Sequence, residues 1–251
     1  MGDAKMDPLD AVWLMMESAD TPMHVGALAI FQKPKGAKDD YLEQLARRWR
    51  RSREFVAPFN SRLARGGRTF PAPRLVKTRK IDLDYHFMRS ALPSPGGERE
   101  LGVVVSRLHS QALDRNRPLW ELHMIEGLER GRFAIYVKVH HALVNHVTGL
   151  PVLLSTLARS ARQRDALPLW SRPLSDAPEP VTESEAWWQD FSGNASSFGQ
   201  AASGLLRGVF SRNKTGGFAL PRGAPASTLN RRINAQRRVA TQSFTRDQIE
   251  Q

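Results

Sequence analysis

The sequence predicts an α/β fold, in which strands and helices alternate along the chain. Two patterns carry the prediction: some stretches place apolar residues at every second position, and others place them every three or four residues. A third observation is size, because 251 residues with 41% hydrophobic composition can bury one large core or two small ones.

Three elements are expected in the first half of the chain. Residues 23–31 are predicted to form a strand that is buried on at least one side, because apolar side chains occupy alternate positions. Residues 39–51 predict an amphipathic helix, and its polar face is mostly arginine. After the proline and glycine residues of 93–97, a second helix is expected, with an apolar stripe formed by Leu101, Val104, Val105, Leu108 and Ala112.

A β-hairpin is expected next, from two alternating runs over residues 120–126 and 132–139 that are joined by residues 127–131. In the second run, one face carries the apolar side chains of Phe133, Ile135, Val137 and Val139. Because side chains alternate across a strand, the pleat directs His141 to this apolar face and His140 to the opposite one. The two imidazoles are therefore expected to have different roles.

The second half of the chain is less regular. A helix is expected over residues 151–162, followed by a proline-rich linker or surface segment over residues 167–180. Residues 183–210 place aromatic side chains at helical spacing, which fits a face packed against the fold or one lying on a lipid surface. Residues 227–244 predict an extended strand or crossing segment, and residues 245–251 predict the first turn of a helix. Because one turn cannot sustain itself, we expect a further segment beyond it.

The composition excludes several classes of site and protein. Without cysteine the chain has no disulfides, no thiolate catalysis and no cysteine metal sites. No stretch approaches the roughly 18 apolar residues that a membrane span needs, and the start of the chain does not predict export. The sequence therefore predicts a cytoplasmic protein.

The charge is positive and unevenly distributed. The net charge is +12, with twelve Lys or Arg against one acidic residue from Arg47 to Lys80, and nine against none from Arg207 to Arg246. Such clusters attract polyanions, which include anionic lipid headgroups, the phosphates of a nucleotide cofactor and nucleic acid. Positive charge is the only feature of the sequence that would support a nucleic-acid partner, because aromatic residues interleaved with the basic ones and a helix-turn-helix signature are both lacking.

Two adjacent histidines, His140 and His141, follow the second hairpin strand and form the candidate site. An imidazole can remove a proton near neutral pH, and the end of a rigid strand holds a catalytic group in one orientation. A zinc site that includes His146 is disfavoured, since no carboxylate cluster lies nearby in the sequence. His140 is expected to be a hydrogen-bonded core residue. Structural or surface roles are expected for His24, His86, His109 and His123.

Four strings in the sequence give a resemblance to a known family. They are PMHVG at residues 22–26, PSPGGERELGVVVSRLHSQALDRNRPLWELHMIEGL at residues 93–128, KVHHALVNHVTG at residues 138–149, and TLNRRINAQRR at residues 228–238. Together they resemble the bacterial wax ester synthase/diacylglycerol acyltransferase family, whose PLW motif falls on residues 118–120. The resemblance covers essentially the whole chain.

The resemblance implies a fold similar to that of the chloramphenicol acetyltransferase and condensation-domain superfamily, with two α/β lobes around a tunnel. This chain would supply one lobe, a mixed sheet flanked by helices, with the second lobe missing from it. The expected domains are an N-terminal acyltransferase lobe with the histidine motif over residues 1–166, a proline-rich linker with an amphipathic aromatic segment over residues 167–226, and a crossover strand with the start of a truncated C-terminal lobe over residues 227–251.

The resemblance also implies a reaction, the transfer of a fatty acyl group from acyl-CoA to diacylglycerol or a long-chain alcohol. In the family motif HHxxxDG the second histidine is the general base, a role that falls on His141, with His140 in support. Asn145 and His146 stand at the family's Asp and Gly positions. These departures from the motif do not exclude that this chain is catalytically inactive. The alternative is a remnant of the family that binds lipid surfaces without catalysis.

The partners implied are acyl-CoA, the acceptor lipid, and the surface of a lipid droplet or the inner membrane, where the protein would bind peripherally. Acyl-CoA is a co-substrate in this reaction, so no cofactor and no metal are expected. Nucleic acid is not expected as a partner.

Overall fold

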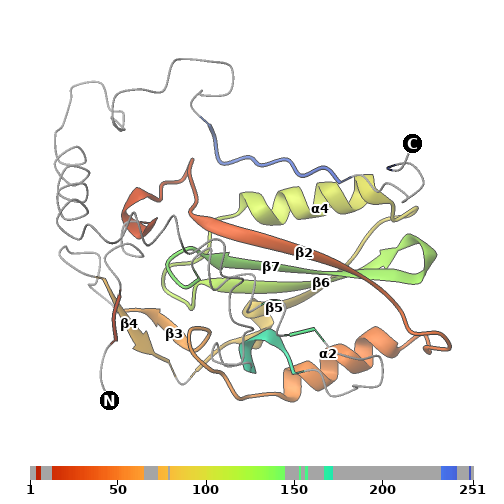
Figure 1. Ribbon diagram of the computed structural model, residues 1–251, viewed down its shortest axis with the longest axis horizontal. Coiled ribbons are helices and arrows are strands. Elements are labelled where there is room, and N and C mark those ends of the chain that lie inside the picture. Colours follow the sequence, from red (N-terminus) through yellow and green to blue (C-terminus); the bar gives the residue numbers. More distant parts are fainter. Residues whose placement is uncertain are drawn as a thin grey trace. The chain divides into compact units, whose positions relative to one another are not determined.

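The computed structural model describes residues 4–6, 13–64, 73–78, 80–144, 153, 156–157, 167–171, 233–241 and 249 (Figure 1). These residues all belong to one compact unit, which comprises Met1–Pro178 and Ile233–Gln251. The second unit, Glu179–Arg232, lies outside the described residues, and with it the aromatic stretch at 183–210 and most of the expected linker.

The centre of this unit is a four-stranded sheet with the strand order β2-β7-β6-β5. Its strands are β2 (His24–Gln32), β5 (Phe87–Ala91), β6 (Trp120–Leu128) and β7 (Arg132–His140). β7 runs antiparallel to both β2 and β6, whereas β5 runs parallel to β6. The sheet is therefore mixed, and the predicted α/β class is confirmed.

The predicted hairpin forms β6 and β7, joined by the short 3-10 turn η1 (Glu129–Gly131). Both strands are longer than expected, and β7 continues to His140, so that His141 opens the turn that follows. In the register of the sheet, His140 lies opposite His24 of β2.

Two helices cover the two faces of the sheet. On one face, α2 (Tyr41–Arg51) packs through Leu42 and Leu45 into a cluster that includes Phe133, Val137 and Val139 of β7. On the other face, α4 (Glu98–Ser110) packs in a second cluster through Leu101, Val104, Val105 and Leu108 against Ala134 and Tyr136 of β7. The apolar face predicted for β7 is thus correct, but the opposite face is buried as well, because α4 covers it.

Two expectations about these elements need correction. α4 ends at Ser110, so Ala112 lies beyond the helix and is exposed. β2 is an edge strand among the described strands, and neither of its faces is fully covered: Val25 and Ile30 are 37% and 42% exposed, while Leu28 and Phe31 contact the two core clusters. An edge position leaves side chains without neighbours on one side, which the alternation of apolar residues does not reveal.

Several short elements were not predicted. They are a second, antiparallel sheet of β1 (Ala4–Lys5), β4 (Arg74–Lys77) and β3 (Ser61–Leu63), and the single turn α3 (Leu83–His86) that leads into β5. The strands β3 and β4 lie in the arginine-rich region and are too short to show a period of two. The start of the proline-rich stretch is also not a linker, because the 3-10 turn η2 (Leu169–Ser171) is buried and Trp170 lies fully inside the core.

Residues 233–241 cross the molecule beside α4, where Figure 1 shows them in blue. They have no regular secondary structure, so of the two predicted possibilities they form a crossing segment and not a strand. The segment is held by hydrogen bonds to two serines of α4: Ser106 Oγ accepts the Val239 N–H at 2.7 Å, and Ser110 Oγ accepts the Arg237 N–H at 2.7 Å. A Cβ atom on Gly102 would lie 2.8 Å from the Val239 carbonyl oxygen, so glycine permits the close approach.

Of the helix expected over residues 151–162, the described positions are Leu153, Thr156 and Leu157, and only Leu153 is helical and contacts the core. Within the described part of the chain, none of the helices combines the length and the apolar character needed to cross a bilayer.

Candidate active site around two histidines

His140, the last residue of β7, is completely buried. The ring atom Nδ1 of His140 accepts a hydrogen bond from the Ala142 N–H at 3.0 Å. The backbone N–H of His140 donates to the Leu119 carbonyl at 3.0 Å. Because Nδ1 is an acceptor, the proton of the neutral ring resides on Nε2. The ring therefore fixes the start of the turn that carries His141. The expected burial and hydrogen bonding of His140 are confirmed, and its supporting role in catalysis stays a prediction.

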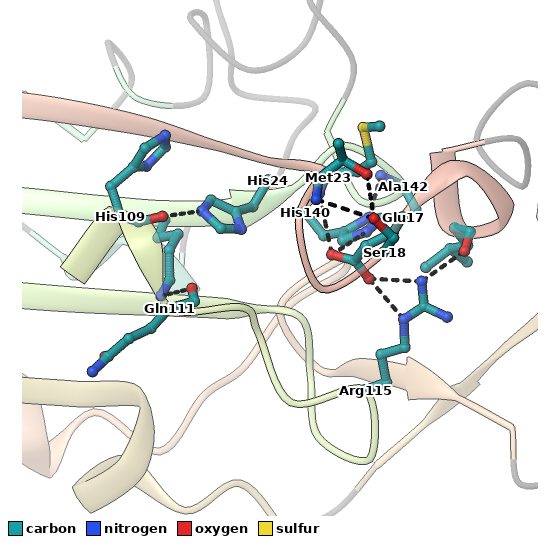
Figure 2. A network of polar contacts seen from close by, with 12 residues as sticks. Glu17, Ser18, Met23, His24, His109, Gln111, Arg115, His140 and Ala142 are labelled. Carbon is teal, nitrogen blue, oxygen red and sulfur yellow. Dashed lines mark hydrogen bonds and ion pairs between the residues drawn. The ribbon is translucent and has the colours of Figure 1, made fainter. Parts of the chain in front are cut away.

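A carboxylate, that of Glu17, faces the other nitrogen of this ring (Figure 2). Glu17 Oε1 lies 3.5 Å from His140 Nε2, which is longer than an ordinary hydrogen bond and places a negative charge beside the N–H. The carboxylate is itself held: Oε1 accepts the Met23 N–H at 3.2 Å, and Oε2 accepts Arg115 Nε at 2.7 Å. Arg115 in turn donates to the Leu14 carbonyl at 2.6 Å.

These contacts determine the charge of Glu17. Burial alone would raise the pKa of its carboxyl group, but the facing ring of His140 and the hydrogen bonds from Met23 and Arg115 lower that pKa to about 2. The side chain is only 7% exposed, so a fixed negative charge is enclosed next to the histidine.

His141 lies in the turn over residues 141–143 and is half-buried. Its backbone N–H donates to the Met23 carbonyl at 3.0 Å. Its ring stacks on the indole of Trp13, with ring centroids 4.6 Å apart and an angle of 20° between the planes. The two histidines thus have different environments, as expected, but the pleat does not set that of His141, because the strand ends at His140. His140 is enclosed, and His141 is held in the turn by its backbone and by one face of its ring.

Trp13 and Glu17 were missed by the sequence analysis. They belong to the N-terminal stretch, whose short apolar run predicts neither export nor a membrane span. The available signal was a tryptophan four residues before a lone acidic side chain at the end of an apolar run, a spacing that places both on one side of a helical turn.

Asn145 and His146, the two positions at which the chain departs from the family motif, lie outside the described residues. Among the residues that the structure describes, no group of three or more His, Cys, Asp or Glu side chains is arranged to hold a metal ion.

The remaining histidines make structural contacts. His24 Nε2 donates to the His109 carbonyl at 2.8 Å, and His109 Nδ1 lies 2.7 Å from the Tyr136 hydroxyl. Burial lowers the pKa of His24 to about 4, and burial also lowers the pKa of His109. His86 and His123 contact the Trp120 carbonyl and the Glu121 carboxylate, at 2.7 Å and 3.2 Å.

A buried ion pair lies two residues before His140. Lys138 is fully enclosed, and its ammonium group lies 2.9 Å from Glu121 Oε2 and donates to the carbonyls of Leu108 and Gln111, at the C-terminal end of α4, at 3.0 Å and 2.9 Å. Burial would raise the pKa of Glu121, but His123 and Lys138 keep it below its ordinary value. The pair ties α4 to the strand that delivers the histidines.

The arginine face predicted for the first helix is present on α2. Arg47, Arg48 and Arg51 are exposed. They line a pocket of about 380 Å³ together with other residues of α2, which are Tyr41, Gln44 and Leu45. Arg47 pairs with Glu43 of the same helix, so Arg48 and Arg51 contribute most to the positive character of this surface.

Comparison with known proteins agrees with this arrangement. A probable diacylglycerol O-acyltransferase of Mycobacterium tuberculosis is 36% identical over 244 residues, which are 97% of this chain and 54% of that protein. The O-acyltransferase WSD of Acinetobacter baylyi is 34% identical over 252 residues, 97% of this chain and 53% of that protein. The chain therefore spans about half the length of the curated relatives it matches.

A solved structure is similar as well. The wax ester synthase/diacylglycerol acyltransferase of Marinobacter aquaeolei VT8 superposes with a TM-score of 0.63 at 41% sequence identity, over 68% of this chain and 41% of that one. The family model of the wax ester synthase/diacylglycerol acyltransferase catalytic domain matches residues 6–251. The resemblance drawn from the motifs is thereby confirmed, and the chain belongs to the wax ester synthase/diacylglycerol acyltransferase family.

Proposed function

We propose that this chain carries the histidine site of an O-acyltransferase that moves a fatty acyl group from acyl-CoA to diacylglycerol or a long-chain alcohol. The observation that supports the proposal is the contrast between the two histidines: His140 is enclosed and anchored, whereas His141 is half-buried, with its ring oriented by Trp13. A general base needs this combination of fixed orientation and access. The M. tuberculosis relative bears the name of such an enzyme.

In the proposed reaction, neutral His141 accepts the proton of the acceptor hydroxyl while that oxygen attacks the thioester carbon of acyl-CoA. The tetrahedral intermediate then collapses by breaking the C–S bond. Protonated His141 returns the proton to the departing thiolate, which leaves as CoA, and the acyl ester is the second product. No covalent bond to the protein forms, so a chain without cysteine can carry out the reaction.

Asn145 and His146 bear on the rate of this reaction. Asparagine keeps the shape of aspartate but loses its charge and gains donors, and His146 brings a side chain where the family has glycine. We propose that this pair lowers turnover, because a base displaced by about 1 Å loses on the order of 100-fold in rate.

The test is the release of CoA thiol from palmitoyl-CoA with hexadecanol or diolein as acceptor, using the polypeptide produced from the intact gene. Turnover in this protein, or recovery of turnover in Asn145→Asp/His146→Gly, supports the acyltransferase. Failure of both proteins contradicts it and supports the second candidate, a family remnant that binds lipid surfaces without catalysis.

We further propose that the exposed arginines of α2 bring the protein to an anionic lipid surface, as a peripheral partner. Basic side chains near such a surface each contribute about 1 kcal/mol to binding. Flotation with vesicles that contain anionic lipid is expected to carry the protein upward, and Arg48→Gln/Arg51→Gln should weaken this. The matched control is Arg99→Gln/Arg107→Gln on α4, where two exposed arginines are also removed. Equal flotation of both variants would contradict the role of α2.

A further inference from the structure

We propose that Trp13 and Glu17 form a clamp that positions the two histidines, with Arg115 holding the carboxylate in place. The inference rests on the proposed function for its catalytic consequence, but its structural content can be tested without turnover. In this arrangement Trp13, Glu17 and Arg115 are positioning residues, and they act on the reaction only through His140 and His141.

One helical turn delivers both members of the clamp. Residues 13–16 are helical, and the Glu17 N–H donates to the Trp13 carbonyl at 3.2 Å. Residues four apart on a helix lie on the same side. The indole of Trp13 therefore reaches the ring of His141, while the carboxylate of Glu17 reaches the ring of His140.

The carboxylate selects one tautomer of His140. A negative charge 3.5 Å from Nε2 favours the tautomer with its proton on Nε2. That tautomer leaves Nδ1 free to accept the Ala142 N–H at 3.0 Å. If the proton moved to Nδ1, two N–H groups would face each other inside the protein, and the turn over residues 141–143 would lose its anchor.

Arg115 completes the clamp on the far side of Glu17 (Figure 2). Its Nε and Nη2 atoms both lie 2.7 Å from Glu17 Oε2, and Nη2 also donates to the Leu14 carbonyl inside the same helical turn. This geometry leaves Oε1 directed at Met23 and His140. Since Met23 also accepts the His141 N–H through its carbonyl, both histidines are linked to the same short stretch of backbone.

The decisive variant is Glu17→Gln, which keeps the size of the side chain and removes its charge. Removing the negative charge beside Nε2 removes the electrostatic preference for a proton there, so the expected result is a larger fraction of the Nδ1-protonated tautomer of His140, read from the imidazole ¹⁵N chemical shifts of histidine-labelled protein. The matched control is Glu129→Gln, which removes another paired carboxylate, 3.0 Å from Arg132, at the far end of the hairpin.

Kinetics provides the second measurement. Where the polypeptide or its Asn145→Asp/His146→Gly variant turns over, Glu17→Gln is expected to lower kcat on the order of 100-fold with little change in KM for acyl-CoA. Glu17→Asp, which keeps the charge, should restore part of kcat. An ordinary structural carboxylate would lower stability in both variants without altering the tautomer.

Trp13 is tested by Trp13→Leu and Trp13→Phe. The ring current of the stacked indole should shift the Hε1 resonance of His141 upfield, so this shift is expected to vanish in Trp13→Leu and to persist in part in Trp13→Phe. An unchanged His140 tautomer in Glu17→Gln, or an unchanged His141 resonance in Trp13→Leu, would overturn the clamp. Because both signals exist in an inactive protein, absence of turnover would contradict only the proposed function.

Discussion

At the scale of single residues, the two neighbouring imidazoles offer a direct contrast. His141→Gln is expected to lower kcat by about 10²- to 10⁴-fold, the usual contribution of a general base, and to leave the urea midpoint of unfolding almost unchanged. His140→Ala, in contrast, is expected to lower both kcat and the urea midpoint, because it removes a fully buried ring that accepts a backbone hydrogen bond. Equal loss of stability in both variants would contradict this division of roles.

The buried imidazole of His24 predicts the pH dependence of stability. In the folded protein its pKa is lowered to about 4 from an ordinary value of 6.5, so the unfolded chain binds a proton first as pH falls. This contribution to the free energy of unfolding is complete above pH 6.5 and is lost as pH falls towards 4. Its size is on the order of 3 kcal/mol, and His24→Gln should flatten the profile in this window.

Glu17 acts in a lower window, because its folded pKa is about 2 against an ordinary 4.5. Its contribution is present above pH 4.5 and is lost as pH falls towards 2. Urea midpoints measured from pH 7 to pH 3 separate the two groups, and a His24→Gln profile identical to that of the wild type would contradict the assignment of the upper window.

Gly26, in the PMHVG motif, predicts a steric effect. A Cβ atom there would lie 2.6 Å from the Tyr136 hydroxyl, which pairs with His109. Gly26→Ala is expected to lower the free energy of unfolding by about 1–3 kcal/mol, as overpacking does. The double-mutant cycle with Tyr136→Phe should recover part of this loss, because the hydroxyl is the closest atom, and strict additivity would contradict the contact.

The sequence predicted the environments of some of these residues and not of others. The alternation in β7 predicted one buried face of the strand, because the pleat fixes side-chain direction, but it does not extend to His141, which lies in the turn beyond the end of β7. Glu17 and Lys138 could not be predicted in the same way. Their partners lie far away in the sequence, and a lone charged residue in an apolar run does not indicate which group will neutralise it.

At the scale of elements, the crossing segment over residues 233–241 gives a sharp prediction. Gly102→Val should displace the Val239 carbonyl from α4, and the amide protons of Arg237 and Val239 should then exchange faster with solvent. Val103→Ala is the matched control on the same helix, because Val103 is 64% exposed. Unchanged exchange at both amides in Gly102→Val would contradict the packing.

The elements with long apolar periodicity, β6, β7, α2 and α4, were all predicted from the sequence. Those that were missed are short, and their structure depends on distant partners. β4 pairs with β1 and β3, and none of the three carries enough apolar residues to show a pattern. The buried turn η2 was not predicted because prolines flank it in the sequence, at Pro168 and Pro173. In the structure the Trp170 indole N–H donates to the Ser52 carbonyl at 3.1 Å.

At the scale of the whole molecule, family membership and the mixed sheet could be inferred from the order of the motifs. Net charge identified the class of partner only, since +12 attracts any polyanion. The arrangement around the site could not be inferred, because it joins three regions: the N-terminal turn, the stretch after α4 that contains Arg115, and the end of β7.

The register of β2 against β7 has a consequence for how the protein is made. His24 and His140 are direct neighbours across the sheet, yet more than a hundred residues must be synthesised between them. The β6–β7 hairpin can close by local contacts, whereas β2 has to bridge a long loop, which is the slower event. On the ribosome, β2 therefore stays unpaired until β7 has been synthesised, and an exposed strand edge in that interval is a place where a nascent chain can aggregate.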